Sequence, residues 1–307
     1  MSTAPSVIAG MMRIAEKTDA EIRALYDTAR GRGVTYFDHA DLYGVGAPGG
    51  GYHRCESRFA GALNLSASAR DEIVLQSKVG IVTDGPYYDS SYEHIIATVE
   101  ESLTALRTDR LDVLLLHRPD ALVEPDEVAR AFDELEATGK VRAFGVSNHT
   151  PRQIDLLRTA VRQTLVVNQL QLSITHAPVI TQGLTANIVG EPGAVDVDGG
   201  GVLDYCRLNG ITVQAWSPFQ KGTERGVFLG DPGYAELNAV LGEVGDAHGV
   251  APAAVATAWI LRHPARMQVV LGSTDPSRFA EASGGADVEL SRREWYRLLR
   301  AAGHRLP

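Results

Sequence analysis

The chain has 307 residues, of which 44% are hydrophobic and 22% are charged, a composition typical of soluble globular proteins and not of disordered or fibrous ones. Its 29 Lys and Arg against 38 Asp and Glu leave a formal charge of -9, which disfavours sequence-independent binding to nucleic acid or to anionic membranes. Cys55 and Cys206 lie far apart and form no CxxC pair, so we expect neither a disulfide framework nor a zinc knuckle.

The N-terminal residues carry neither the basic nor the apolar segment of a secretion signal. No apolar run reaches the length that crosses a bilayer. We therefore expect a cytoplasmic protein with no membrane association.

Eight short apolar runs rich in Val, Ile and Leu are the predicted strands. In chain order they cover residues 7–9, 35–37, 73–76, 113–116, 143–146, 165–167, 212–215 and 268–271. Stretches with helical periodicity lie between them, for example residues 19–32 and 94–106. Thr18 and Glu21 form a capping box that predicts the start of the first of these helices.

Eight apolar strands that alternate with helices predict a parallel sheet covered by helices, and eight such units close a (β/α)8 TIM barrel. We predict an α/β protein with a single barrel domain over residues 1–307, and a doubly wound open sheet is the alternative. The glycine-containing stretch 38–54 and the polar stretch 181–201 depart from the alternation, and the second is too weakly periodic to predict a helix. Both follow strands, where barrel loops build active sites, and the second could cover the mouth of the site.

Three consecutive predicted strands end in titratable side chains. Asp38 and Tyr43 follow the second strand, Lys78 follows the third and His117 follows the fourth. A partly buried lysine needs a partner, which Asp38 or another acid could supply. Taken singly, Asp38 could merely cap the next element and His117 could be a core residue. A closed barrel brings consecutive strand ends together, which favours a functional cluster.

Proton donation to a carbonyl oxygen is the chemistry that suits this cluster. The pKa of a phenol is ordinarily near 10, and a nearby ammonium group favours the phenolate, so we expect Lys78 to lower the pKa of Tyr43 towards working pH. Asp38 would hold Lys78. His117 would orient the carbonyl and donate a second hydrogen bond to its oxygen.

Six spaced motifs, in order, resemble those of the aldo-keto reductase superfamily over essentially the whole chain. They are Phe37–Gly44 (FDHADLYG), Ser77–Lys78, residues 114–119 (LLLHRP), residues 139–148 (GKVRAFGVSN), Asn168–Gln169 and residues 215–218 (AWSP). The resemblance implies a catalytic tetrad of Asp38, Tyr43, Lys78 and His117. It also implies reduction of an aldehyde or ketone to an alcohol, with Tyr43 as general acid and hydride from a reduced nicotinamide.

The resemblance implies a set of cofactor contacts as well. Ser147, Asn148 and Gln169 would hold the nicotinamide carboxamide, Trp216 would stack on the ring, and the pyrophosphate would be lined by Ser217, Pro218, Phe219 and Gly222. Met11 is assigned to the pocket wall.

Ser273 and Arg278 match the family's segment for the adenosine end. Family members that prefer NADP commonly have a Lys or Arg near residues 272–275, whereas this chain has Asp275. Arg278 could meet the 2′-phosphate by a charge-assisted contact. We therefore predict NADP, as NADPH, with NAD as the alternative, together with a small-molecule carbonyl substrate and a monomer or weak homo-oligomer.

Three other interpretations stay open. Residues 44–49 match GxGxxG, but Pro48 interrupts them and the next predicted helix begins only near Arg54, so a Rossmann site is not favoured. A metal-dependent barrel hydrolase could use Asp38, His39, Asp41, His117 and Asp120, although Lys78 among them opposes a divalent cation. A cofactor-sensing or regulatory subunit with little turnover is the third. His39, Tyr52 and His53 could line the substrate side or lie on the surface.

Overall fold

Eight parallel strands form a closed barrel in this computed structural model, which describes residues 6–185, 201–222 and 226–306. The strand order is β1, β10, β9, β8, β7, β6, β3, β2. The barrel strands are β1 (Val7–Gly10), β2 (Tyr36–Asp38), β3 (Val74–Val79), β6 (Val113–Leu116), β7 (Phe144–Ser147), β8 (Leu165–Gln171), β9 (Thr212–Trp216) and β10 (Gln268–Leu271). The predicted (β/α)8 barrel is thus confirmed, and the open doubly wound sheet is wrong because the sheet closes on itself.

Each predicted strand corresponds to one barrel strand. Several strands extend beyond their predicted ends, among them β2, β3 and β8, so Asp38 and Lys78 lie within strands and do not follow them. A short hairpin of β4 (Ile81–Val82) and β5 (Tyr87–Tyr88) follows β3.

The helices alternate with the barrel strands. They are α1 (Asp19–Gly31), α2 (Arg54–Leu63), α3 (Ala67–Asp71), α4 (Tyr92–Leu106), α5 (Pro125–Ala137), α6 (Pro151–Leu157), α7 (Pro178–Leu184), α8 (Val202–Leu208), α9 (Ala235–His248), α10 (Pro252–Leu261), α11 (Pro276–Ser283) and α12 (Arg292–Ala301). The predicted capping box of Thr18 and Glu21 begins α1. The stretch 181–201, too weakly periodic in sequence to predict a helix, contains the end of α7, a short helix with proline in its first turn. Residues 186–200 lie outside the described residues.

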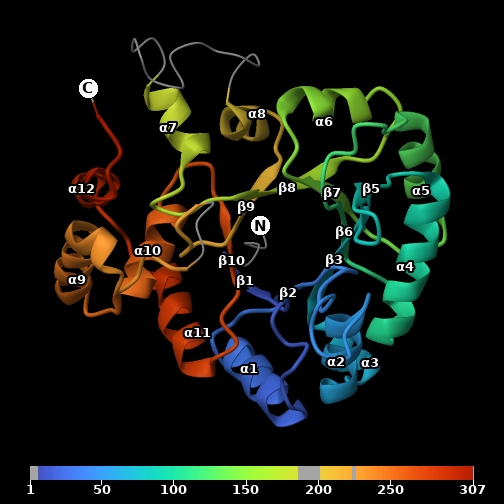
Figure 1. Cartoon of the computed structure of the whole chain (residues 1–307), viewed down its shortest axis with the longest axis horizontal. Coiled ribbons are helices and arrows are strands. Elements are labelled where there is room, and N and C mark those ends of the chain that lie inside the picture. Colours follow the sequence, from blue (N-terminus) through green and yellow to red (C-terminus); the bar gives the residue numbers. More distant parts are fainter. Residues whose placement is uncertain (1–5, 186–200, 223–225, 307) are drawn as a thin grey trace. The chain divides into compact units, whose positions relative to one another are not determined.

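The described residues group into two compact units. The larger comprises Ile8–Asn168 and Gly272–Pro276. In it, α1, α2, α4 and α5 follow one another around the outer side of the strands (Figure 1). Aromatic contacts join helices to strands: the Tyr26 and Phe37 rings stack with centroids 5.2 Å apart, and Phe37 also lies 5.4 Å from Phe59. The apolar face of α1 and α2 is thereby buried against β2, which carries Asp38.

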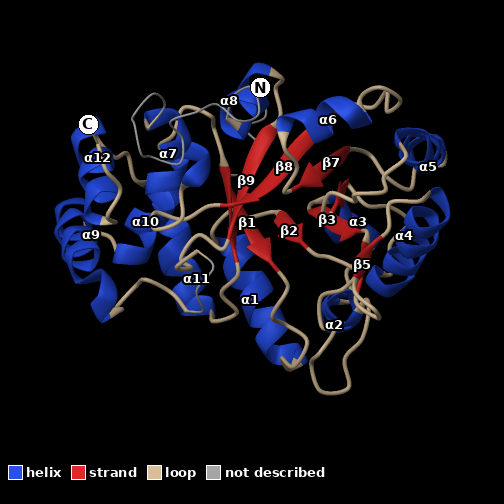
Figure 2. Cartoon of the chain, turned by 45° about the horizontal axis from the view of Figure 1, so that its top comes forward, coloured by secondary structure: helices blue, strands red, loops and turns tan. Residues whose placement is uncertain are grey.

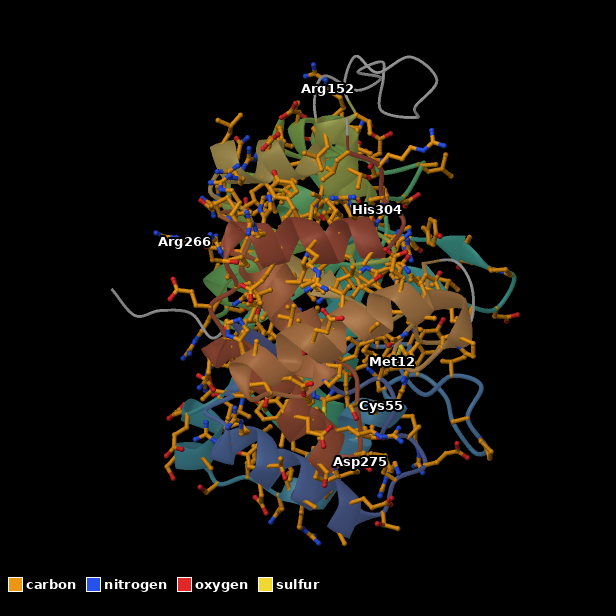
Figure 3. All side chains as sticks on the ribbon, turned by 90° about the vertical axis from the view of Figure 1, so that its left-hand side faces the viewer. Met12, Cys55, Arg152, Arg266, Asp275 and His304 are labelled. Atoms are coloured by element: carbon orange, nitrogen blue, oxygen red, sulfur yellow. The ribbon has the colours of Figure 1, made fainter. Side chains whose placement is uncertain are left out.

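Of the described residues, the smaller unit comprises 169–185, 201–222, 226–271 and 277–306, together with Ser6 and Val7. Its helices α9, α10 and α12 lie side by side (Figure 2). The indoles of Trp259 and Trp295 stack with centroids 4.9 Å apart, and each Nε1 donates to the other residue's backbone carbonyl. His304, which follows α12 and is labelled in Figure 3, bonds through a ring nitrogen to the carbonyl of Ile174 at 2.6 Å. These contacts secure the C-terminal helix within this unit.

Among the helices described, none is long and apolar enough to cross a membrane. The expectation of a single domain over residues 1–307 stays a prediction.

Candidate active site

The pairing of β2 with β3 places the first group of site residues. Asp38 on β2 is in register with Gln76 on β3, and Lys78 follows Gln76 by two residues. Side chains two residues apart on a strand point to the same face. Asp38 and Lys78 therefore meet on one side of the sheet, deep in the larger unit, where Lys78 is 0% exposed.

Lys78 is the centre of the site. Its Nζ donates to Oδ1 and Oδ2 of Asp38 at 2.7 and 2.8 Å, to the backbone carbonyl of His39 at 2.8 Å and to the hydroxyl of Tyr43 at 3.0 Å. The predicted pairing of Lys78 with Asp38 is present. Because the Tyr43 oxygen accepts from an ammonium that can only donate, the phenol keeps its own proton for another acceptor.

The electrostatics of Tyr43 differ from the sequence-based expectation. Burial raises the pKa of this phenol above its ordinary value of 10, and this outweighs the lowering by the charge of Lys78. The predicted net lowering is wrong because removing a phenolate from water costs more than one ammonium group returns. The phenol is consequently protonated at neutral pH, with the ammonium group of Lys78 at 3.0 Å from its oxygen.

Lys78 remains an ammonium group despite its burial. Burial by itself would lower the pKa of Lys78, but the charge of Asp38 and the contacts with Tyr43 raise it above the ordinary value. A buried cation with a carboxylate at 2.7 Å keeps its proton.

His117 follows β6, where its backbone N–H donates to the carbonyl of Val79 at 2.8 Å. Its ring lies edge-on to the Tyr43 ring, with centroids 6.0 Å apart and an interplanar angle of 80°. Burial, with the charges of Lys78 and Arg118, holds the pKa of His117 well below its ordinary value. The ring is therefore a neutral imidazole, which donates one hydrogen bond and accepts one. The structure thus brings all four predicted tetrad residues together within the larger unit.

A second buried cluster lies beside the tetrad, and sequence reasoning missed it. Glu56 on α2 is 0% exposed and bonds to the hydroxyl of Ser77 and to Nδ1 of His53, both at 2.6 Å. His53 also bonds through Nε2 to Glu101 at 3.1 Å. Burial alone would raise the pKa of Glu56, but the His53 and Ser77 hydrogen bonds lower it. This cluster ties α2 to β3 next to Lys78; the glutamate two residues into a helix carries no sequence signal of its burial.

His39, Tyr52 and His53, which the sequence allowed either to line the substrate side or to lie on the surface, differ in their surroundings. His39 is 0% exposed, packs edge-on against Phe59 at 4.8 Å, and its ring nitrogens have no hydrogen-bond partner in the part of the chain that the structure describes. His53 belongs to the Glu56 cluster. Tyr52 is exposed, but its hydroxyl bonds to the hairpin at Ile81 and accepts from the backbone of Thr83.

Neither the Rossmann-type phosphate site at residues 44–49 nor the metal site of a barrel hydrolase has the geometry that it would need. The chain from Gly44 to Gly49 is a run of turns, and α2 begins only at Arg54, so no strand–turn–helix cradle for a pyrophosphate exists there. Gly44 has φ +105°, and a Cβ on it would lie 2.6 Å from the Cβ of Arg54, so glycine serves close packing. For the metal site, Asp38 is paired with Lys78, while Asp120 accepts the backbone N–H groups of Ser90 and Leu122.

Three residues predicted at the cofactor site lie in the larger unit near strand ends. Met11 is 2% exposed, and its backbone N–H donates to the carbonyl of Asp38 at 2.9 Å. Asn148, directly after β7, has φ 61° and donates through Nδ2 to the hydroxyl of Ser147 at 2.7 Å. A positive φ is uncommon for residues other than glycine and marks functional sites more often than other positions.

The smaller unit carries the next predicted contacts. Gln169 on β8 is buried and donates through Nε2 to Oε1 of Gln214 at 3.0 Å. Trp216 ends β9 half-buried, and Ser217 after it has φ 55°. The turn continues through buried Pro218 and half-buried Phe219 to Gly222, whose carbonyl accepts from Gln171 at 2.8 Å.

The predicted adenosine-binding residues surround the start of α11. The hydroxyl of Ser273 accepts from the backbone N–H of Asp275 at 3.3 Å, which shapes the turn in which Asp275 lies (Figure 3). Arg278, in the first turn of α11, is exposed. In sequence, an anion, Asp275, directly precedes α11, and a cation, Arg278, follows three residues later.

A cavity of about 610 Å³ in the smaller unit is lined by residues such as Ile180, Arg262 and Trp295, and none of the predicted site residues lines it. This cavity is therefore separate from the predicted catalytic and cofactor-binding residues.

Comparison with known proteins decides the family. The chain matches the model of the aldo/keto reductase family over residues 6–302. It belongs to that family. This aldo/keto reductase is 35% identical to the uncharacterized oxidoreductase YcsN of Bacillus subtilis (strain 168), over 98% of this chain and 95% of that protein. It is 34% identical to a 6-dehydroglucose reductase of Agrobacterium fabrum, over 95% of this chain and 92% of the relative.

A solved structure of the thermostable aldo-keto reductase Tm1743 shares the fold with a TM-score of 0.74 at 21% identity, and the match covers 97% of this aldo/keto reductase and 95% of Tm1743. Because its relatives are oxidoreductases and reductases, the chain is an oxidoreductase of the aldo/keto reductase family, a family that generally uses NAD(P)H.

Proposed function

We propose that this enzyme reduces an aldehyde or ketone to an alcohol with NADPH, with Tyr43 as the general acid. The observation that carries the proposal is the buried ammonium group of Lys78, which contacts both the Asp38 carboxylate and the Tyr43 hydroxyl. A phenol held by an ammonium group can release its proton to a carbonyl oxygen and be stabilised as the phenolate.

Each tetrad residue has a separate role in the proton step. Tyr43 donates its hydroxyl proton to the carbonyl oxygen as negative charge develops there. Lys78 stabilises the phenolate that remains, and Asp38 keeps Lys78 charged in its buried position. His117, as a neutral imidazole, donates a hydrogen bond to the same carbonyl oxygen and orients it.

The residues at the strand ends fit a nicotinamide cofactor. A carboxamide both donates and accepts hydrogen bonds, as the Ser147 hydroxyl and the Asn148 and Gln169 amides do, and Trp216 offers an aromatic face for stacking. We assign the pyrophosphate to the turn that runs from Ser217 through Pro218 and Phe219 to Gly222. Met11 is assigned to the pocket wall. When bound, the reduced nicotinamide supplies a hydride to the carbonyl carbon.

Preference for NADPH over NADH is the part of the proposal that depends on the adenosine end. We propose that Arg278, an exposed guanidinium on α11, pairs with the 2′-phosphate, and that Ser273 contributes a hydroxyl. Asp275 opposes this with its own charge. Arg278→Ala should therefore weaken NADPH binding about tenfold and leave NADH binding within about twofold; equal losses for both would exclude a role in recognising the 2′-phosphate.

The reaction is tested by the loss of NADPH absorbance with a panel of small aldehydes and ketones. The panel includes 6-dehydroglucose, because the Agrobacterium fabrum relative is a 6-dehydroglucose reductase. Tyr43→Phe should lower kcat at least about 10²-fold while cofactor affinity is kept. Tyr26→Phe, which removes a phenolic hydroxyl from α1 in the same unit, is the matched control and should retain activity. Tight cofactor binding with no turnover by wild type would favour a cofactor-sensing subunit instead.

We further propose that the enzyme acts in the cytoplasm on a small-molecule carbonyl compound, as a monomer or weak homo-oligomer. Sedimentation at several protein concentrations tests the oligomeric state.

A further inference from the structure

A chain of buried hydrogen bonds continues from Asp38 away from the reacting phenol. Nε2 of Gln76 donates to Oδ1 of Asp38 at 2.6 Å, and the hydroxyl of Tyr36 donates to Oε1 of Gln76 at 2.7 Å. Gln76 is 0% exposed and Tyr36 is 6% exposed. Hydrogen bonds in such surroundings are strong, and an unpaired partner there is costly.

The strand pairing explains why these groups meet. Tyr36 and Asp38 lie two residues apart on β2, and Gln76 and Lys78 lie two residues apart on β3, so each pair shares a face of its strand. Asp38 is in register with Gln76. The amide of Gln76 therefore lies between the phenol of Tyr36 and the carboxylate of Asp38.

Only one direction of hydrogen bonding is consistent with this chain. The Asp38 carboxylate, which faces a lysine ammonium group, only accepts, so the NH₂ of Gln76 must face it. The amide oxygen then faces Tyr36, whose hydroxyl must donate. Each of the three side chains is thus held in a single orientation.

We propose that Gln76 is a positioning residue for the reaction: it holds the Asp38 carboxylate in the orientation that grips Lys78, and Tyr36 fixes the amide of Gln76. Oδ1 of Asp38 accepts from both Gln76 and Lys78, at 2.6 and 2.7 Å. A second donor on one carboxylate oxygen restrains its rotation and takes up part of its charge. The inference rests on the proposed function, because Asp38 matters here through Lys78 and Tyr43.

The first test is Gln76→Met, which keeps the length of the side chain but removes the donor. We expect kcat for carbonyl reduction to fall about tenfold with little change in KM, because the loss affects the orientation of Lys78 and not substrate binding. Tyr36→Phe removes only the group that fixes the amide and should have a smaller effect in the same direction.

The matched control is Gln163→Met. Gln163 is also a buried glutamine of the larger unit, 8% exposed, and its Nε2 donates to the carboxylates of Asp133 at 2.7 Å and Glu136 at 3.0 Å, away from the tetrad. Gln163→Met removes the same kind of amide–carboxylate hydrogen bond, so any loss of kcat that has a purely structural cause should appear in this variant too. We expect its kcat to stay within about twofold of wild type.

A second variant, Gln76→Glu, separates positioning from packing. The carboxyl group that it introduces donates to Asp38 only while protonated. The groups that face it are Tyr36 and Asp38 on β2 and Lys78 on its own strand, while Val113, in register on β6, is uncharged. We expect kcat close to wild type at about pH 5 to 6 and a decline towards that of Gln76→Met as pH rises, because two carboxylates then face each other.

Equal losses of kcat in Gln76→Met and Gln163→Met, or a pH profile of Gln76→Glu parallel to wild type, would overturn the positioning role. Wild-type turnover by Tyr43→Phe would instead refute the proposed function, so the two failures have different signatures. Absence of turnover by wild type on every carbonyl compound would refute both.

Discussion

Replacing Asp38 by asparagine tests the central ion pair of the site. The ammonium group of Lys78 is 0% exposed and has the Asp38 carboxylate at 2.7 Å. Asp38→Asn keeps the shape but removes the only negative charge that contacts this cation in the described residues. Removing one partner of a buried ion pair typically costs about 3–5 kcal/mol.

The same magnitude follows from the proton equilibrium of Lys78. An ammonium group that has lost its counter-charge can release its proton, and from the ordinary lysine pKa this costs about 4.6 kcal/mol at pH 7. We therefore expect Asp38→Asn to be destabilised by about 4–5 kcal/mol at that pH. In wild type, Asp38 raises the pKa of Lys78 despite burial. The ion pair therefore stabilises the fold fully below the pKa of Lys78 in the unfolded chain, and this stabilisation is lost as pH rises through the pKa of Lys78 in the folded protein.

In Asp38→Asn the pKa of Lys78 is lowered and not raised, because the lysine is still buried but no longer has a carboxylate beside it. The difference in free energy of unfolding between wild type and Asp38→Asn should shrink by up to about 2.7 kcal/mol between about pH 7 and pH 9. Lys78 is protonated in the unfolded variant and neutral in the folded one, and protonation stabilises the unfolded chain less as pH rises. Denaturant unfolding at the two pH values measures this. Turnover should fall about 10²-fold because a neutral Lys78 no longer stabilises the phenolate.

Two further variants complete the experiment. Asp38→Asn combined with Lys78→Met leaves no buried charge and should be more stable than Asp38→Asn alone, but without recovered activity. Asp112→Asn breaks another well-buried ion pair of the same unit, with Arg70 at 2.8 Å, and should lose stability with unchanged kcat. Our reasoning fails if Asp38→Asn matches wild type in stability, or if its deficit does not change with pH.

Three other predictions concern His117 of the proposed tetrad and two residues outside it, Asp41 and Trp295. Burial raises the pKa of Asp41 to about 7, so this acid destabilises the fold increasingly between about pH 4 and 7 and fully above that, by roughly 4 kcal/mol. Asp41→Asn should thus be more stable than wild type at about pH 8 and similar to it at about pH 4, and an equal difference at both pH values would contradict this. The ring of His117 should be neutral at about pH 6, because burial and Lys78 lower its pKa; NMR shifts typical of an imidazolium there would show otherwise. Trp295→Ala should lose about 3–5 kcal/mol of unfolding free energy, because the stacked pair with Trp259 is buried, and Trp295→Phe should lose clearly less. Similar losses for both variants would argue against the stack as the source of stability.

The amino-acid sequence by itself determined the barrel and predicted the four residues of the proposed tetrad. Apolar runs of strand length, spaced by helical periodicity, are local patterns, and the capping box at Thr18 is written in adjacent residues. Asp38, Lys78 and His117 stood out because a titratable group directly after an apolar strand is conspicuous in any sequence. The resemblance to a family supplied the cofactor contacts, which are still proposals.

Only the tertiary structure decided what those groups experience. The net rise in the pKa of Tyr43 depends on how deeply the phenol is buried, and no stretch of sequence contains that quantity. The chain from Tyr36 through Gln76 to Asp38 and the contacts of Glu56 with His53 and Ser77 involve polar residues unremarkable in sequence. They meet because the register of β2 against β3 and the packing of α2 bring together residues up to 40 positions apart, and proximity of that kind is a property of the fold, not of any segment.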